Sequence, residues 1–406
     1  MAAFMSTLPE LRLKKNEDRR LRAGHLWLYS NEVDNKQTPL KEFSAGQWSH
    51  VTNSRGRVLG TAYVNPNSLI CARLVSRFEN QTLTRQRLVE RIQQALRLRD
   101  NIFSVPCYRL IYGESDALPG LVVDRFYDVL VVQVTTAGMD AIQDDIIEAL
   151  SEVLKAKTIL LRNDSGSREL EGLELYSKTV LGELPELVEL EENGTRFVTS
   201  LEQGQKTGWF YDHRLNRQRT QQYVKDKRVL DVFSYVGGWG VEALQAGAKE
   251  VTCVDASAFA LDLAKQSAAL NNKEDRFTAM EGDAFEALKS LAEDKEKFDV
   301  VILDPPAFVK RRKDLKEGSL AYRRINRLAM GLVKNEGTLV SASCSYHLGR
   351  EQLLNEIRQA SYLANVDCQV LEQGHQGPDH PVHPAMKETD YLKSYICHVK
   401  NGASKK

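Results

Sequence analysis

Hydrophobic and polar residues follow three different patterns along the chain. Residues 8 to about 78 hold short apolar stretches separated by turn signals, which predicts a compact β-rich region. Over residues 80–101 apolar side chains recur at helical spacing among charged ones, which predicts one amphipathic helix. The next region predicts a small α/β domain, with strands at 108–112, 120–124, 129–135 and 158–162 and a helix at 139–155.

From about residue 226 onward, predicted strands alternate with predicted helices. The strands are 228–233, 250–254, 298–303 and 338–342, and the helices are 240–246 and 258–270. This alternation predicts a mostly parallel sheet with helices on both faces, whose ligand crevice lies where the strands end. We therefore expect an α/β protein with three domains: a β-rich domain over 8–79, an α/β middle domain over 80–190 and a Rossmann-like domain over 191–400. The acidic segment 183–193 indicates a connector or an exposed hairpin.

The overall composition fits a folded protein that is not embedded in a membrane. Of the 406 residues 42% are hydrophobic, a usual fraction for a globular chain. The longest apolar runs are strand-sized, whereas a membrane span needs about 20 apolar residues. The first eight residues lack the basic segment and apolar core of a secretory signal. The six cysteines share no CxxC spacing, which disfavours a metal site or a disulfide framework and favours a reducing cytoplasm.

A glycine turn and a series of acidic residues mark a candidate cofactor site. The strand 229–233 runs into residues 234–240, where glycines let the backbone approach a ligand closely. The spacing is not the GxGxxG of dinucleotide binders. An acidic residue follows each of the next strands, where a carboxylate accepts from ribose hydroxyls or an adenine amino group, or caps a helix. The order favours an adenosine ligand, and the candidate contacts are Phe233, Ser234, Tyr235, Gly237, Asp255, Asp283 and Asp304.

Basic residues are concentrated although the formal net charge is zero. One cluster lies within residues 12–22, and a second follows directly after the segment 304–308. A solvated helix face explains a single cluster equally well. Two clusters, one of them beside the candidate site, favour contacts with RNA phosphates. The candidate RNA contacts are Arg20, Arg22, Arg311, Arg312 and Lys313.

Several segments carry a resemblance to a known family: 24–30, 113–121, 124–126, 204–214, 233–240, 304–308 and 343–345. With them the chain resembles bacterial RNA cytosine-C5 methyltransferases of the large-subunit ribosomal RNA type, over residues 11–399. That family joins an N-terminal PUA domain, a middle α/β domain and a class I methyltransferase domain. The resemblance implies S-adenosylmethionine as cofactor and a cytosine in 23S ribosomal RNA as substrate, and is compatible with a homodimer. It also implies that 204–214 form a hairpin at the methionine end of the cofactor, with Arg214 available to the carboxylate.

Methylation at C5 of cytosine needs an activated ring, and a thiolate that adds at C6 supplies the activation. Cys344 follows the predicted strand 338–342 and so lies at the cofactor edge of the sheet, which makes it the candidate nucleophile. Cys71, Cys253 and Cys397 stand in apolar strands and are predicted to be packing residues. Nearby cations should raise the thiolate fraction of Cys344, but the sequence does not show which cations these are.

Asp304 is the candidate catalytic partner of Cys344, placed at the N3 or N4 edge of the base. The group that removes the C5 proton stays open between a water, Asp304 and another loop. His380 and His383 are candidates from such a loop, although their flanking prolines more often mark a structural turn.

Two other functions stay open. Methylation of a purine amino group uses an acid or amide, two prolines and an aromatic that stacks on the base. Here Ala307 follows the two prolines and the aromatic residue, Phe308, comes one position later. Amino-group methylation would also leave Cys344 without a catalytic role. The other alternative, an RNA-binding scaffold with an inactive methyltransferase domain, is disfavoured by the intact acids at Asp255, Asp283 and Asp304.

Overall fold

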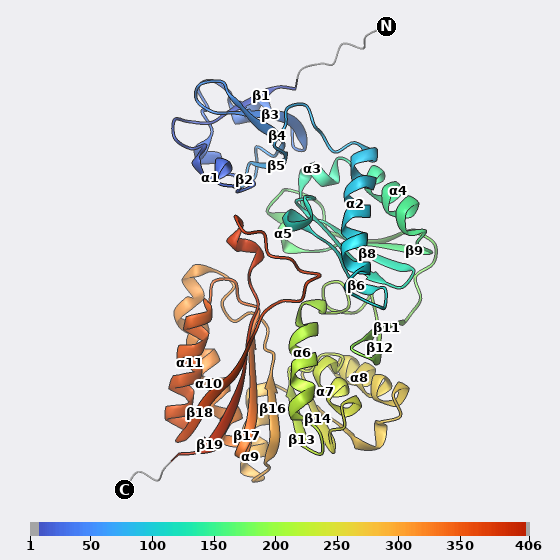
Figure 1. Cartoon of the computed structure of the whole chain (residues 1–406), viewed down its shortest axis with the longest axis vertical. Helices are drawn as coiled ribbons and strands as arrows, with labels where there is room; N and C mark the ends of the chain where they lie inside the picture. The colour runs from blue at the N-terminus through green and yellow to red at the C-terminus, as the bar shows by residue number, and fades with distance from the viewer. Residues whose placement is uncertain (1–7, 403–406) are drawn as a thin grey trace. The chain divides into compact units, whose positions relative to one another are not determined.

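The computed structural model describes residues 8–402. The first seven residues, for which no secretory signal is predicted, and the last four of the polar tail lie outside the described residues. The chain divides into two compact units. The first holds the chain up to Glu186 together with Gln205–Thr207 and Pro378–Thr389, and the second holds the remainder. In Figure 1 the N-terminal half runs from blue to green, and the C-terminal half runs from yellow-green to red.

The first sheet of the first unit covers the region predicted to be β-rich. Its strands lie in the order β1-β3-β4-β5-β2, with β1 and β3 parallel and the other pairs antiparallel. Leu11, Leu28 and Val51 are fully buried in its core. The strand bounds are β1 Glu10–Arg12, β2 Trp27–Leu28, β3 Gln47–Thr52, β4 Val58–Val64 and β5 Ala72–Ser76, with the short helix α1 at Arg19–Arg22.

A second sheet follows in the same unit, in the order β10-β9-β8-β7-β6 (Figure 1). The helix predicted over 80–101 begins later, because the side chain of Thr84 caps it by accepting from the Arg87 N–H. The helix predicted over 139–155 is two helices, because Ile142 leaves the helical conformation. The bounds are α2 Arg85–Asp100, β6 Cys107–Tyr112, β7 Leu121–Phe126, β8 Val129–Val134, α3 Ala137–Asp140, α4 Gln143–Leu154, β9 Thr158–Asn163, α5 Gly166–Glu169 and β10 Tyr176–Leu181.

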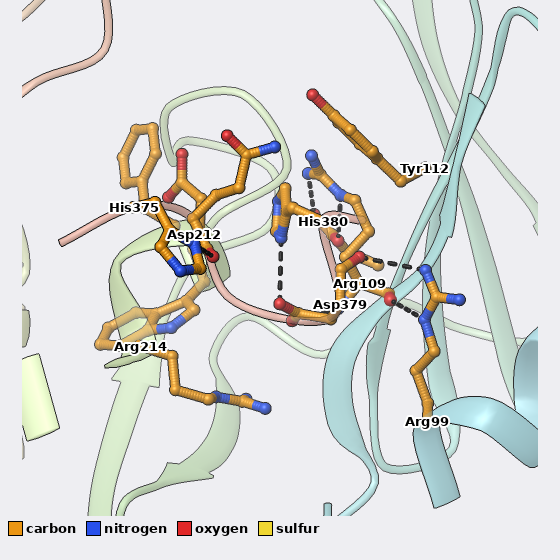
Figure 2. A network of polar contacts seen from close by, with 12 residues as sticks. Arg99, Arg109, Tyr112, Asp212, Arg214, His375, Asp379 and His380 are labelled. Carbon is orange, nitrogen blue, oxygen red and sulfur yellow. Dashed lines mark hydrogen bonds and ion pairs between the residues drawn. The ribbon is translucent and has the colours of Figure 1, made fainter. Parts of the chain in front are cut away.

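The segment Pro378–Thr389 belongs to the first unit although it comes late in the sequence. Figure 2 shows Asp379, which is fully buried, pointing toward His380 and lying near Arg99. The Asp379 carboxylate lies 3.0 Å from His380 Nδ1 and accepts from the Arg109 backbone N–H over 3.1 Å, and the Asp379 carbonyl accepts from Arg99. His380 is thus a buried residue that helps hold this segment, in line with the structural turn that its prolines indicate.

The second unit is built on a seven-stranded sheet in the order β15-β14-β13-β16-β17-β19-β18. The first five strands are parallel, and β19 pairs antiparallel with both β17 and β18, so the prediction of a mostly parallel sheet is confirmed. Side chains of α9, α10 and α11 share one core with β13, β16, β17 and β19. The strand bounds are β13 Arg228–Val232, β14 Glu250–Asp255, β15 Phe277–Glu281, β16 Phe298–Leu303, β17 Val333–Ser343, β18 Val366–Gly374 and β19 Lys393–Asn401. The helix bounds are α6 Arg214–Thr220, α7 Gly238–Gln245, α8 Ala258–Leu270, α9 Ala284–Glu293, α10 Leu315–Leu332 and α11 Arg350–Ala364.

A separate hairpin precedes this sheet in the second unit. It pairs β11 Val188–Glu192 with β12 Thr195–Thr199, and covers part of the acidic segment for which a connector or hairpin is predicted. Its last acidic residue, Glu192, is buried rather than exposed.

Candidate functional site

The turn after β13 has a strained backbone. Phe233 and Tyr235 adopt φ angles of 65° and 48°, in the left-handed region that side chains other than glycine rarely enter. Such residues cost about 1–3 kcal/mol each and cluster at functional sites. The Val254 carbonyl accepts from the N–H groups of Phe233 and Ser234 and so fixes the turn against β14. Gly237, at φ 81°, then leads into α7.

Asp231 supports this turn from the core. Its Oδ2 accepts from the Gly240 N–H over 2.9 Å, and burial raises its pKa to about 7. A Cβ at Gly240 would lie 2.6 Å from the sulfur of Cys253, which explains both the glycine and the packing role predicted for that cysteine. The glycine turn is therefore tightly packed against the core.

Asp255, at the end of β14, also contacts the turn. Its two carboxylate oxygens accept from the N–H groups of Tyr235 and Ser257 over 2.8 and 2.9 Å. An ionised carboxylate has about four acceptor sites, so two remain for ribose hydroxyls. The position fits the predicted contact with the cofactor.

Asp283 is the N-cap of α9, one of the two alternatives that the sequence leaves open. A single oxygen of its carboxylate accepts from the N–H groups of Phe285 and Glu286. The residue is exposed, so its second oxygen can still accept from an adenine amino group. The contact with adenine stays a prediction.

Asp304, after β16, lies in a pair that the sequence does not reveal. His213 Nε2 lies 3.1 Å from Asp304 Oδ1, and the Trp239 indole donates to Oδ2 over 3.0 Å. Burial raises the pKa of Asp304, but the charge of His213 and both hydrogen bonds outweigh it and lower the pKa below its ordinary value. Burial lowers the pKa of His213, and the charge of Asp304 outweighs it and raises the pKa. Both shifts favour an ionised carboxylate beside a protonated imidazole.

Cys344 lies in a loop that Tyr322 of α10 holds at both sides. The Ser343 hydroxyl donates to the fully buried Tyr322 hydroxyl over 2.9 Å, and the Ser345 hydroxyl lies 2.9 Å from the same oxygen. Ser345 also accepts from the Val309 N–H over 3.1 Å, which ties this loop to the loop after Asp304. Both serine side chains thus point into the core. Cys344 is partly exposed, whereas Cys71, Cys253 and Cys397 are buried.

Parallel pairing places Asp304 and Cys344 at one edge of the sheet. Leu303, the last residue of β16, is the register partner of Ser341 of β17, which continues to Ser343 at the same edge. The structure therefore brings the glycine turn, Asp255, Asp304 and Cys344 to the carboxyl ends of adjacent strands, where α/β sheets bind ligands.

The predicted hairpin at 204–214 is wrong. Tyr211–His213 form a 3₁₀ turn and α6 begins at Arg214. The physical reason is Glu192, whose buried side chain pairs with Arg214 over 3.1 Å and also with Arg217. Helical spacing places these two arginines on one face, as the buried carboxylate requires. Arg214 is 5% exposed and already pairs with Glu192, so a cofactor carboxylate would have to bind the same guanidinium beside Glu192.

The candidate RNA contacts differ in how exposed they are. Arg20 bonds to Glu32 over 2.7 Å and lies over the Tyr29 ring, which orients its guanidinium. The Arg22 side chain is 63% exposed beside Asp18. In the second unit, all three predicted cations before α10 are exposed: Arg311, Arg312 and Lys313.

Three further residues of the site have no clear signal in the sequence: His213, Tyr322 and Lys393. His213 lies in the segment 204–214 that carries the family resemblance, but no motif there assigns it a role. Tyr322 reads as a core position of an amphipathic helix, and Lys393 as a single charge in a strand. Within residues 8–402 no group of three or more His, Cys, Asp and Glu side chains could hold a metal ion. In the same range we find no helix with the length and hydropathy of a membrane span.

Comparison with protein families agrees with this architecture. Residues 173–391 match the family model described as S-adenosylmethionine-dependent methyltransferase, and residues 11–77 match a PUA-like domain. The first match covers more than half of the chain, which defines it as an S-adenosylmethionine-dependent methyltransferase with an N-terminal PUA-like domain.

The curated relatives narrow the family. The ribosomal RNA large subunit methyltransferase I of Enterobacter sp. (strain 638) is 36% identical over 392 residues, 95% of this chain and 98% of that protein. The protein of the same name from Escherichia coli is 35% identical, again over 95% of this chain and 98% of its own. The chain belongs to the ribosomal RNA large subunit methyltransferase I family.

Solved structures share the fold. A candidate methyltransferase crystallised with SAH has a TM-score of 0.83 at 21% identity, over 96% of this chain and all of that one. A candidate S-adenosylmethionine-dependent methyltransferase from Streptococcus mutans has a TM-score of 0.81 at 20% identity with the same coverage.

Proposed function

We propose that this protein methylates C5 of a cytosine in the 23S RNA of the large ribosomal subunit, through a covalent bond between Cys344 and C6. The observation that carries the proposal is the Ser343–Ser345 loop. Tyr322 turns both serines inward, which leaves Cys344 partly exposed at the sheet edge that also bears Asp304 and the glycine turn. The relatives named for ribosomal RNA support the substrate class, and such a substrate agrees with the cytoplasmic location that the sequence predicts.

The cofactor fits this edge of the sheet. Asp255 retains acceptor sites for ribose hydroxyls, and Asp283 has an exposed carboxylate after the neighbouring strand β15. The strained turn after β13 lies on the other side of Asp255 and holds Phe233, Ser234, Tyr235 and Gly237. S-adenosylmethionine, when bound, supplies the electrophilic methyl group for the C5 carbon.

Cys344 performs the activating step as a nucleophile. Its thiolate adds to C6, which breaks the C5–C6 double bond and moves an electron pair through the ring toward N3. The displaced pair returns through C5 and forms the bond to the methyl group. When the C5 proton is then removed, the pair of the C5–H bond re-forms the C5–C6 double bond, and the sulfur leaves as a thiolate with the pair of its bond to C6. The group that takes the C5 proton stays open.

Asp304 orients the base. Because its pKa is lowered it is ionised, and it can accept from the cytosine N4 amino group. When charge develops at N3, the proton of His213 can reach the ring through Asp304, since the two side chains lie 3.1 Å apart.

RNA would be held by basic side chains of both units. The PUA-like domain bears Arg20 and Arg22, and the exposed cations Arg311, Arg312 and Lys313 follow the loop of Asp304. We propose that the chain has three domains, over residues 8–79, 80–190 and 191–400, of which the first binds RNA and the last carries the catalytic site.

Mass spectrometry of the product nucleoside tests the proposal. Unmodified 23S RNA incubated with the wild-type protein and cofactor should yield 5-methylcytidine. Cys344→Ser should yield none while still binding the cofactor. Cys368→Ser, a matched change at the other partly exposed cysteine, should act normally. An N4-methylated cytidine or a methylated purine would show amino-group chemistry instead, and cofactor binding without any product would favour the scaffold.

A further inference from the structure

Lys393 is a buried cation whose charge has no carboxylate partner. It is 5% exposed, on the first residue of β19. Among residues 8–402, no carboxylate lies within ion-pair distance of its ammonium group. A buried charge normally has such a partner, because desolvation without one costs several kcal/mol. The position therefore needs another source of stabilisation.

Backbone oxygens supply part of it. Lys393 Nζ donates to the carbonyl of Ser345, and over 2.7 Å to the carbonyl of Tyr391. An ammonium has three N–H donors, so a third is left after these two bonds. The two carbonyls fix the ammonium in place without neutralising it.

Cys344 lies in the sequence between Ser343 and Ser345, which both lie against Lys393. Ser343 is the register partner of Lys393 in the antiparallel pair of β17 and β19, and Ser345 accepts from Nζ. A negative charge on the Cys344 sulfur would act on both Lys393 and Tyr322, and it raises the pKa of each. Burial is the larger influence on Lys393 and lowers its pKa to about 8.

The other charged and titratable groups around this pair do not replace Lys393. Burial raises the pKa of Tyr322 to about 12, so its hydroxyl stays neutral. Arg350 at the start of α11 donates to the carbonyls of Gly374 and Leu392 and lowers the pKa of Lys393, whereas Asp390 raises it. Lys393 is the cation that the Ser345 carbonyl itself binds.

We infer that Lys393 is a positioning residue that holds the sulfur of Cys344 as a thiolate, ready to add to C6. The inference rests on the proposed function, because it assigns the cation that activates the nucleophile. It explains why a lysine is buried at this register position: the ammonium and the thiolate are each other's counter-charge. Thiols beside a lysine commonly have a pKa well below that of free cysteine, about 8.5.

Alkylation of Cys344 by iodoacetamide, followed peptide by peptide across pH, tests the inference without RNA or cofactor. Only the thiolate reacts, so the midpoint of the rate profile reports the pKa of the thiol. Lys393→Met should move the midpoint of Cys344 to higher pH and slow its alkylation at pH 7 by about tenfold. Lys393→Arg, which keeps the charge, should restore most of the rate. The profile of Cys368, on β18, should stay unchanged in all variants and serves as an internal control.

An unchanged Cys344 profile in folded Lys393→Met would overturn the inference. If the Lys393 variants do not fold, the pKa of the Cys344 thiol can be measured in wild-type protein instead. The thiolate absorbance near 240 nm is followed across pH, and the absorbance of Cys344→Ser is subtracted. A value at or above that of free cysteine would then overturn it. Failure here would leave Cys344 as the proposed nucleophile with a different activator. Conversely, a low thiol pKa in a protein that makes no 5-methylcytidine would contradict the proposed function and leave the inference about Lys393 intact.

Discussion

The pair of His213 and Asp304 should make stability depend on pH in a defined window. Removal of one partner of a buried ion pair costs about 3–5 kcal/mol, because the other charge is left buried. His213→Leu should therefore destabilise the second unit by about this amount at pH 5.5. Both side chains are largely buried, with exposed fractions of 4% and 20%, so solvent screens the pair little.

The sign of the pH effect follows from the two pKa shifts. The pKa of His213 is raised on folding, so its contribution is complete below the unfolded value of about 6.5 and is lost as pH rises through the folded pKa. The pKa of Asp304 is lowered, so its contribution is complete above about 3.9 and is lost as pH falls through the folded pKa. The full effect thus lies between about pH 4 and 6.5.

Urea unfolding measures this effect. With Trp27 and Trp48 replaced by Phe, the fluorescence comes from Trp209 and Trp239, which both lie in the second unit. The difference in unfolding free energy between wild type and His213→Leu should shrink at pH 9.5, because neutral His213 no longer offsets the charge of Asp304. The matched change His398→Leu, at a partly exposed histidine of the mostly buried β19, should show no such dependence. An equal gap for His213→Leu at both pH values would refute the ion pair.

Three further predictions concern the cofactor, the RNA and the nucleophile loop. Asp255→Ala should weaken S-adenosylmethionine binding by about 1.5–3 kcal/mol in calorimetry, because a charged acceptor of ribose hydroxyls is lost. Tyr322→Phe removes two hydrogen bonds to buried serines, and should cost about 2–4 kcal/mol in urea unfolding and slow methyl transfer. Binding titrations at several salt concentrations should show weaker RNA binding and a shallower salt dependence after replacement by Ala of Arg311, Arg312 and Lys313.

Each of these has a control and a contrary outcome. Asp275→Ala, a change at an exposed acid just before β15, should leave cofactor affinity unchanged; if Asp255→Ala does so too, Asp255 is not a ligand. Unaltered stability of Tyr322→Phe would mean that the serine loop is not held by this hydroxyl. For RNA, the control replaces three other exposed cations, Lys225, Lys265 and Lys295. An equal loss of affinity in both triple variants would mean that the cluster before α10 acts only through overall charge.

The elements that the sequence predicts best are those with buried apolar runs. The helix Ala258–Leu270 and the strand Phe298–Leu303 have the predicted bounds, because their burial pattern follows the hydrophobic pattern. The strand β18 was not predicted, and β15 was expected before Asp283 only without bounds, since both are edge strands with mostly exposed or half-buried side chains. Their conformation comes from ladder bonds to a neighbouring strand, which leave no hydrophobic signature.

Some residues of the candidate site could likewise be located from the sequence, and others could not. Asp255, Asp304 and Cys344 could be located because each follows a predictable strand, and parallel strands end at one edge. His213 and Lys393 could not, because their partners are distant in sequence and come together only through α6 and the antiparallel strand β19. The hairpin that the family resemblance implied at 204–214 was wrong for the same reason, because Arg214 begins a helix whose arginines pair with the distant, buried Glu192. The homodimer stays a prediction.

The covalent bond to Cys344 is the central claim, and RNA that contains 5-fluorocytosine tests it most directly. Fluorine leaves no proton to remove from C5, so after methyl transfer the sulfur cannot leave and the protein stays bound to the RNA. With wild-type protein and S-adenosylmethionine we expect an adduct that survives denaturing electrophoresis, and whose nuclease-treated peptide carries the nucleotide on Cys344. Cys344→Ser should form none, whereas Cys368→Ser should form it normally. An adduct at another residue, or normal methylation of cytosine by Cys344→Ser, would contradict the account.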